Sequence, residues 1–210
     1  MSFEQTISEE IVAEVTVSPQ KQAILDVAQA LFAQYGYEGL SIRDLAEHCG
    51  LAKATLYHHF RDKQELFMSV LTQEMVSLHG RIMLAATSEH SPPEKLRLVI
   101  NTYGQLIGER RSLIMTTLHA NVELESQLRQ FAKTHKQYLL GPLTQIVQQG
   151  IDQGDFRAVD AQMSALCLIG MLNAFVSYQV LLNEMEFDGD VAEHVLSLFL
   201  NGIRTENRHS

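Results

Sequence analysis

The segment SIRDLAEHCGLAKATLYHHF, residues 41–60, restricts the possible fold more than any other part of the chain. Ser41 begins the segment as a helix-capping residue, and Gly50 stands where a left-handed backbone conformation would end a first short helix. A second short helix is predicted over residues 53–60, with Leu51 filling the corner between the two. Two short helices joined by a tight turn can place one helix in a DNA groove, but ordinary packed surface helices share the pattern. Helical spacing of three and four residues gives the first helix an apolar face of Ile42, Leu45, Ala46 and Cys49.

The outward side of the second predicted helix is short and mostly polar. Lys53 can meet a phosphate as a point charge, and Thr55, Tyr57 and His58 can donate hydrogen bonds to phosphate oxygens. Ala54 or Thr55 can also contact a thymine methyl group. These are the side chains that a helix lying in the major groove requires.

The flanking segments also predict helices. Ser18 and Pro19 form a helix start, and Gly36 is expected to end that helix. The sequence Asp62-Lys63-Gln64-Glu65 places a capping residue three positions before a glutamate, which predicts another helix start. Lys63 then stands in a first turn, where an anion can bind. Apolar side chains keep helical spacing in the first of these helices, at Ile24, Val27, Ala28, Leu31, Phe32 and Tyr35.

The run from residue 23 to residue 67 resembles the N-terminal domain of the tetracycline-repressor (TetR) family of transcriptional regulators. The matching motifs are A-x-x-L-F-x-x-x-G-Y at 28–37, S-I-x-D-L-A at 41–46, G-L-A-K-A-T-L-Y-x-H-F at 50–60 and K-x-E-L-F at 63–67. The resemblance implies a three-helix DNA-binding head followed by an all-helical body that binds a ligand and dimerises. Arg43 and Ala54 occupy positions where family members differ, so they are candidates for choosing the DNA sequence. The resemblance also places Ser41, Arg43, Lys53, Thr55, Tyr57, His58 and Lys63 at DNA-contacting positions.

The charge balance opposes strong non-specific DNA binding. The formal net charge is −9, and residues 19–66 hold five basic and six acidic side chains. We therefore expect weak non-specific affinity, specific binding that needs a dimer, and sensitivity to salt. A helical interaction protein without DNA binding stays open as an alternative. Residues 1–17, which contain Glu4, Glu9, Glu10 and Glu14, are expected to form a disordered acidic leader.

The rest of the chain predicts helices and no strands, so the expected fold class is all-α, with a head at 18–66 and a body at 67–210. Gly141-Pro142 should kink one long helix near residues 138–141. The lone Cys49 and Cys167 lie on apolar faces, which predicts buried, inert thiols in a reducing cytoplasm. The expected body helices span residues 62–86, 93–107, 113–118, 123–152, 160–183 and 190–204, with an interruption at 108–111.

Residues 163–182 carry no charged side chain, which would suit a membrane span or a helix buried on two sides. Polar residues within the segment and the lack of basic flanks favour the second interpretation. Two helices from each subunit would then form a four-helix interface in a two-fold dimer, and two heads would read a palindromic operator. The predicted interface residues are Gly170, Ala174, Val195, Leu198 and Phe199.

The resemblance also implies a pocket for a small effector in the body, and the Met and aromatic content suggests a largely apolar one. His119 and His135 lack a neighbouring acid at ligand spacing, so no metal or other cofactor is expected. The sequence shows no nucleophile–base spacing and no glycine-rich phosphate loop, which argues against an enzyme. Together these patterns predict a ligand-responsive repressor, released when its effector shifts the conformational population. Candidate pocket residues are Tyr103, Met115, His119, Phe131, His135, Tyr138, Met171, Phe175 and Tyr178.

Overall fold

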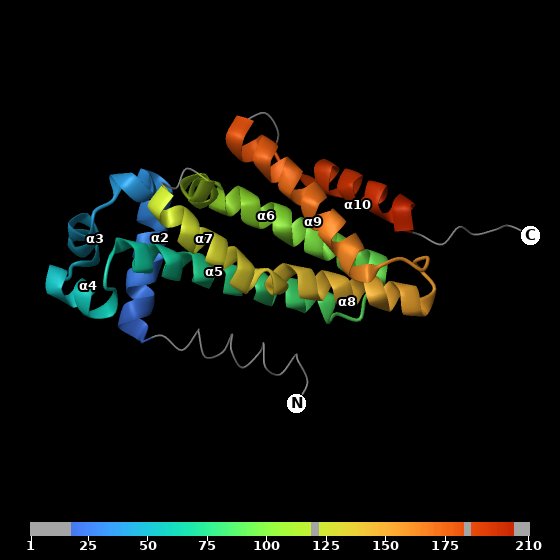
Figure 1. Ribbon diagram of the computed structural model, residues 1–210, viewed down its shortest axis with the longest axis horizontal. Helices are drawn as coiled ribbons and strands as arrows, with labels where there is room; N and C mark the ends of the chain where they lie inside the picture. The colour runs from blue at the N-terminus through green and yellow to red at the C-terminus, as the bar shows by residue number, and fades with distance from the viewer. Residues whose placement is uncertain (1–17, 119–121, 183–185, 204–210) are drawn as a thin grey trace, which may run out of the picture. The chain divides into compact units, whose positions relative to one another are not determined.

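The computed structural model describes residues 18–118, 122–182 and 186–203, and within these ranges the regular structure is helical throughout (Figure 1). The expected acidic leader, residues 1–17, lies outside the described residues. The all-α fold class is confirmed. The helices are α2 (Pro19–Gly39), α3 (Ile42–Cys49), α4 (Lys53–His59), α5 (Lys63–Ala86), α6 (Pro92–Leu118), α7 (Val122–His135), α8 (Gln137–Gln153), α9 (Ala161–Ser177), the π-helix η1 (Tyr178–Leu182) and α10 (Gly189–Ile203).

The chain divides into two compact units. The first unit comprises the described residues of Met1–Val76 and Ser112–Phe131, and the second comprises those of Ser77–Arg111 and Ala132–Ser210. The boundary expected between residues 66 and 67 falls inside α5, which continues from one unit into the other.

The first helix of the first unit is bent where glycine permits it. Ser18 caps α2 by accepting a hydrogen bond from the Lys21 amide at 3.2 Å, as the sequence predicts. Gly36 has φ 72° and ψ 175°, a conformation that side chains with a Cβ rarely adopt. The helix resumes beyond Gly36 to Gly39, so this glycine bends the helix and does not end it as expected.

The core of the first unit joins α2, α3, α4 and the start of α5, with one side chain from α7. Phe32 and Phe67 are both fully buried, and their rings meet edge to face at 4.9 Å. This core fixes how α3 and α4 present their outer faces. Its buried members are Ile24, Leu25, Ala28, Leu31, Phe32, Leu40, Leu45, Ala46, Leu56, Phe60, Leu66, Phe67, Val70, Leu71 and Leu124.

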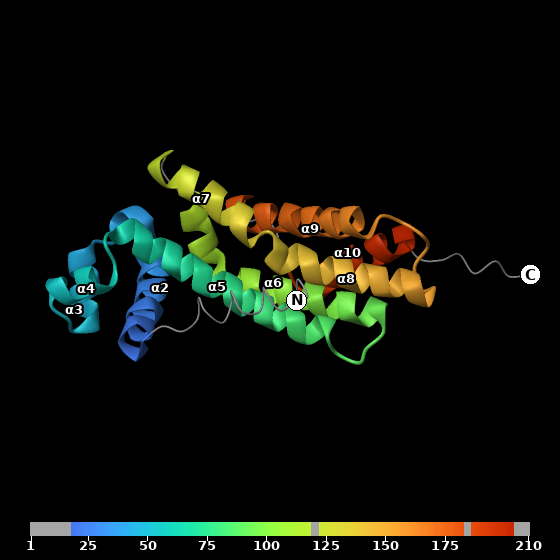
Figure 2. The same cartoon turned by 60° about the horizontal axis from the view of Figure 1, so that its bottom comes forward.

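In the second unit, α9 packs beside α8 and α10 (Figure 2), and η1 continues α9 at its C-terminal end. The loop between α8 and α9 is held by Phe156, whose ring lies against Gly150, where a Cβ would come within 2.2 Å of a ring carbon. The fit requires glycine at position 150. Asp160 then caps α9 by accepting from the Met163 amide at 2.8 Å.

Two sequence predictions for the body helices are wrong. The expected interruption at 108–111 is absent, because α6 runs unbroken over Pro92–Leu118. The long helix expected over 123–152 is broken between His135 and Gln137, earlier than the kink predicted at 138–141. Pro142 instead lies inside α8.

The proline is tolerated because another helix replaces the hydrogen bond that it removes. Pro142 has no N–H to donate to the carbonyl of Tyr138, four residues earlier. That carbonyl accepts a hydrogen bond from His79 Nδ1 of α5 at 2.7 Å. Since a carbonyl oxygen can only accept, this contact places the proton on Nδ1 of His79.

The two cysteines differ from the expectation of buried thiols. Cys167 is exposed in the described chain, and Cys49 is partly buried. Burial raises the pKa of the Cys49 thiol, which lowers its reactivity.

Among the described residues, no helix combines the length and apolar character needed to span a membrane.

Candidate nucleic-acid interface

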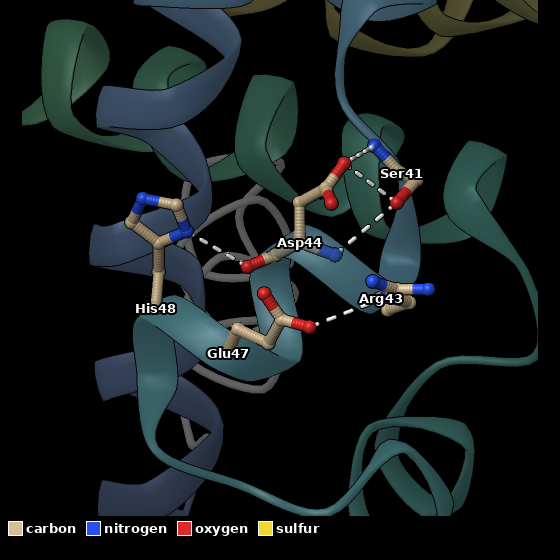
Figure 3. Close-up of polar contacts among 5 residues, drawn as sticks. All are labelled: Ser41, Arg43, Asp44, Glu47 and His48. Carbon is tan, nitrogen blue, oxygen red and sulfur yellow. Dashed lines mark hydrogen bonds and ion pairs between the residues drawn. The ribbon is translucent and has the colours of Figure 1, made fainter.

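Helix α3 begins with a reciprocal cap (Figure 3). The Asp44 amide donates to Ser41 Oγ at 3.1 Å, and the Ser41 amide donates to Asp44 Oδ2 at 3.1 Å. The Ser41 hydroxyl also donates to Asp44 Oδ2 at 2.6 Å. Hydrogen bonds from the Ser41 side chain and backbone hold the pKa of Asp44 below its usual value. The predicted capping role of Ser41 is therefore confirmed, and its hydroxyl is engaged within the protein.

The turn between α3 and α4 uses glycine as the sequence predicts. Gly50 has φ 66° and ψ 28°, in the left-handed region. Its amide donates to the carbonyl of Glu47 at 3.2 Å, and the Leu51 amide donates to that of Ala46 at 2.9 Å. These bonds satisfy carbonyls at the end of α3 and turn the chain sharply into α4.

Helix α4 has one buried and one exposed side. Leu56 is 1% exposed and anchors the helix in the core, and Phe60 anchors the residue after it. The predicted contact residues are on the other side: Lys53, Ala54, Tyr57 and His58 are exposed, and Thr55 is half-buried. The structure thus brings together the residues of α4 that the sequence singled out.

A hollow of about 520 Å³ opens between α3, α4 and the start of α5. Its lining contains the cations Arg43, Lys53, Arg61 and Lys63, against the carboxylates of Glu38 and Asp62. The near-neutral head therefore concentrates positive charge on one surface, as phosphate recognition requires. The remaining lining residues are Leu40, Ser41, Ile42 and Tyr57.

Two of the exposed cations in the hollow are paired with neighbours. Arg43 Nε lies 3.2 Å from Glu47 Oε1 (Figure 3), and the ammonium of Lys53 lies 5.5 Å from the centroid of the Tyr57 ring. The Arg43 pair is highly exposed, so it contributes little to stability and can open towards a phosphate.

Arg61 was missed by the sequence interpretation. It lines the hollow between α4 and α5, and its Nε lies 3.2 Å from Asp62 Oδ2. The sequence could have indicated this role, because Arg61 directly follows the buried Phe60 and stands two residues before Lys63. Motif comparison did not single out this position, because the matching motifs end at Phe60 and resume at Lys63.

The start of α5 is capped as the sequence predicts. The Glu65 amide donates to Asp62 Oδ1 at 2.7 Å, and Glu65 Oε2 accepts from the Arg61 amide at 2.9 Å. The bond from the Glu65 amide is the main reason that the pKa of Asp62 is lowered. At the C-terminal end of α4, His59 Nε2 lies 3.1 Å from Gln20 Oε1 of α2. The C-terminal end of α4 and the turn that follows it are thus tied to α2 and α5.

The candidate effector residues do not form one group. In the second unit Tyr103 is buried and its hydroxyl donates to Asn173 Oδ1 at 2.6 Å, while the rings of His135 and Tyr138 meet at 5.0 Å. Phe131 instead packs against the core of the first unit.

The remaining effector candidates vary in exposure. Met171 and Phe175 are half-buried, whereas Tyr178 is 51% exposed. His119 and the side chain of Met115 lie outside the described residues.

The candidate dimer residues also divide. Gly170, Ala174 and Leu198 are exposed, as residues of a dimer interface should be when one subunit is considered alone. Val195 is 0% exposed and Phe199 is 6% exposed, because both face the chain's own core. Assigning these two to the interface was wrong, since a fully buried side chain has no surface left for a partner.

Comparison with known proteins agrees with this geometry. A family model described as bacterial regulatory proteins, tetR family, matches residues 24–70, and a model described as tetracyclin repressor-like, C-terminal domain, matches residues 89–177. Together the two models cover more than half of the 210 residues. The chain belongs to the TetR family. It is a transcriptional regulator with a helix-turn-helix DNA-binding head, and the family is regulatory, not enzymatic.

TetR-family relatives match over most of the chain. The fatty acid metabolism regulator protein of Bacillus subtilis is 26% identical over 194 residues, which cover 90% of this chain and 97% of that protein. The HTH-type transcriptional repressor KstR2 of Mycolicibacterium smegmatis is 28% identical over 140 residues, 66% of this chain and 68% of that protein. The crystal structure of FadR from Bacillus subtilis in complex with stearoyl-CoA aligns with a TM-score of 0.73 and 25% identity, covering 87% of this chain and 99% of that chain.

Proposed function

We propose that this regulator is a repressor that binds a palindromic operator as a homodimer and is released by a long-chain acyl-CoA. The cationic hollow formed by α3, α4 and the start of α5 is the observation that supports DNA binding at this surface. In this proposal Lys53, Arg43 and Arg61 contact phosphates, and Tyr57, Thr55 and His58 donate to phosphate oxygens. Ala54 approaches the base edges.

The acidic net charge makes a dimer necessary for tight binding. Each head carries few cations, so one head alone would bind weakly at physiological salt. Two heads on one duplex bind together, and the second contact is intramolecular. A two-fold dimer with heads roughly 34–36 Å apart, or somewhat more, would read successive major grooves of a palindrome.

The proposed dimer surface is the outer face of α9 with the exposed part of α10. Met163 and Leu166 of α9 and Tyr178 of η1, which continues α9, are each about half exposed, and Leu198 of α10 is 52% exposed. Gly170 and Ala174 lie between them without bulky side chains, which lets two helices approach closely. Exposed apolar side chains that recur along one helix are typical of a protein interface.

The proposed effector class rests on the relatives. Relatives that match over most of the chain include a fatty acid metabolism regulator and a FadR structure that holds stearoyl-CoA. The buried side chains of the second unit are mostly apolar, which agrees with a largely apolar effector, and Lys95, His135 and Gln179 are the polar side chains buried among its described residues. An acyl-CoA is a cytoplasmic molecule, and the proposed site of action is the cytoplasm.

A mobility-shift titration tests the proposal. The probe is a duplex selected by the wild-type protein from a randomised pool, titrated in the presence of stearoyl-CoA, free coenzyme A or stearate. We expect stearoyl-CoA to weaken binding by about 5- to 150-fold, the usual range of allosteric coupling, and coenzyme A to have no effect. Recovery of no selected duplex would exclude the repressor function, and an unchanged affinity with stearoyl-CoA would exclude the effector class alone.

A further inference from the structure

Lys63 is the one cation of the hollow that also reaches into the protein. It is the first residue of α5, and it is half-buried. Its Nζ donates to the carbonyl of Tyr37, 26 residues earlier, at 2.8 Å. The same ammonium lies 4.3 Å from the centroid of the Tyr37 ring, within the range of a cation–π interaction. The backbone carbonyl and the ring of Tyr37 therefore both contact Lys63.

The Tyr37 carbonyl is accessible because of the local backbone. Gly36 bends α2 just before Tyr37. In a regular helix the carbonyl of Tyr37 would accept from the amide of Ser41, four residues later. That amide donates instead to Asp44 Oδ2, as part of the α3 cap. The cap of α3 thus uses the Ser41 amide, and Lys63 donates to the Tyr37 carbonyl in its place.

The Tyr37 ring is itself fixed in the core of the first unit. It stacks on Phe32 of α2 at 6.1 Å and meets Phe67 of α5 edge to face at 5.1 Å. Lys63 and Phe67 lie four residues apart on α5, so both contact Tyr37 from the same helix face. The contacts join the bent end of α2, which leads directly into α3, to the first turn of α5.

We propose that Lys63 is a positioning residue that fixes the α3–α4 pair on α5, and that it does not act as a phosphate contact. A charged donor on a carbonyl is a strong hydrogen bond, and its geometry is fixed by the packed ring. Lys53 provides the contrast, because it is exposed and can leave the Tyr57 ring to meet a phosphate. The proposal rests on DNA binding by the head.

Salt dependence separates the two roles. The selected operator duplex and a scrambled duplex are titrated at several salt concentrations with wild type, Lys63→Gln, Lys63→Arg and the matched control Lys53→Gln. Loss of a phosphate contact lowers the slope of log K against log salt by about 0.9 per contact. Loss of a positioning contact lowers affinity at an unchanged slope. We therefore expect Lys63→Gln to bind the operator about five- to tenfold more weakly with the wild-type slope.

The control and the conservative variant complete the test. Lys53→Gln should show the reduced slope, and Lys63→Arg should recover most of the affinity, because a guanidinium can donate to the carbonyl and lie on the ring. A reduced slope for Lys63→Gln would overturn the proposal and make Lys63 a phosphate contact. A lowered melting temperature with unchanged affinity at 10 °C would also overturn it, because the role would then be stability alone. Wild-type protein that binds neither duplex would overturn both this proposal and the proposed function.

Substitutions at the partner residue give an independent measurement. Tyr37→Phe keeps the ring and the carbonyl, so it should bind operator like wild type. Tyr37→Leu removes the ring, and combining it with Lys63→Gln should weaken binding less than the sum of the two single effects. Strict additivity would show that Lys63 and Tyr37 act separately, which would overturn the proposal.

Discussion

The outer faces of α4 and α9 are both exposed, and they differ in chemistry. Around α4 the exposed side chains are cations and hydrogen-bond donors, and several are held by neighbours such as Glu47 and Asp62. Along α9 and at the start of η1 the exposed side chains are uncharged and largely apolar, with Met163, Leu166 and Tyr178 each about half exposed. One face suits a charged, hydrated partner, and the other suits a dry protein surface.

The difference shows how an acidic protein can bind an anionic polymer. Net charge describes the long-range field, whereas binding depends on the few charges within about a Debye length of the phosphates. The hollow beside α4 collects four cations, although the whole chain has a net charge of −9. The apolar α9 face would then supply the second head, which compensates for the weak charge of each one. Predictions that change one face and leave the other intact can test this division.

The largest effect is expected from a charge on the α9 face. A Cβ at Gly170 meets nothing within 4 Å in the chain, so Gly170→Asp should fold and leave a carboxylate on the proposed interface. We expect monomers in sedimentation and about a 100-fold or greater loss of operator affinity, because two-headed binding is lost. Gly80→Asp is the matched control, since Gly80 is also an exposed mid-helix glycine with open space around it. A Gly170→Asp protein that sediments as a dimer would remove α9 from the interface.

A smaller effect is expected from the polar face. Lys53→Gln or Tyr57→Ala should weaken binding to operator and scrambled duplexes about equally, by roughly tenfold, because both side chains would contact phosphate. The dimer should remain intact in sedimentation. Lys136→Gln, an exposed cation of the second unit, is the control and should bind as wild type does. A change of base preference with unchanged overall affinity would show that the phosphate roles are wrong.

The third prediction concerns the body alone. His79→Leu removes the hydrogen bond from His79 to the Tyr138 carbonyl next to Pro142, and the loss of one such bond costs about 0.5–1.5 kcal/mol. We expect a melting temperature several degrees lower in thermal denaturation followed by circular dichroism. Adding Pro142→Ala should restore part of the loss by returning the backbone N–H. A double variant no more stable than His79→Leu would argue against this pairing.

The smallest effect is expected at Tyr103. Burial raises the pKa of Tyr103 to about 12, from an ordinary value near 10. The folded state therefore favours the neutral phenol, so the associated stability is fully present below pH 10 and is lost as the pH rises towards 12. The difference in absorbance at 295 nm between wild type and Tyr103→Phe should show ionisation only near pH 12. A titration centred near pH 10 would mean that the hydroxyl is accessible to solvent.

Sequence reasoning succeeded where the determining interactions are local. The Ser41–Asp44 and Asp62–Glu65 caps and the left-handed Gly50 depend on residues within four positions of one another. The two-sided character of α4 follows from its helical period, so Leu56 could be assigned to the core without a structure. These features together also carried the family resemblance.

Sequence reasoning failed where contacts with distant segments decide the structure. Residues 108–111 contain a glycine and three charged residues, a pattern that suggests an interruption, yet α6 continues through them. Helix α10 is apolar on several sides, so its period could not tell whether Val195, Phe199 or Leu198 faces the chain's own core. In the folded chain Val195 and Phe199 are buried, whereas Leu198 is exposed.

The sequence by itself determined the helical elements of the head, their caps and the residues that form the polar face of α4. Only the tertiary structure decided that Arg61 joins the hollow, that His79 compensates for Pro142, and that Lys63 bonds to Tyr37. The physical reason is range. Capping and helical period act over three or four residues, whereas these contacts join segments that lie next to one another only after the helices have packed.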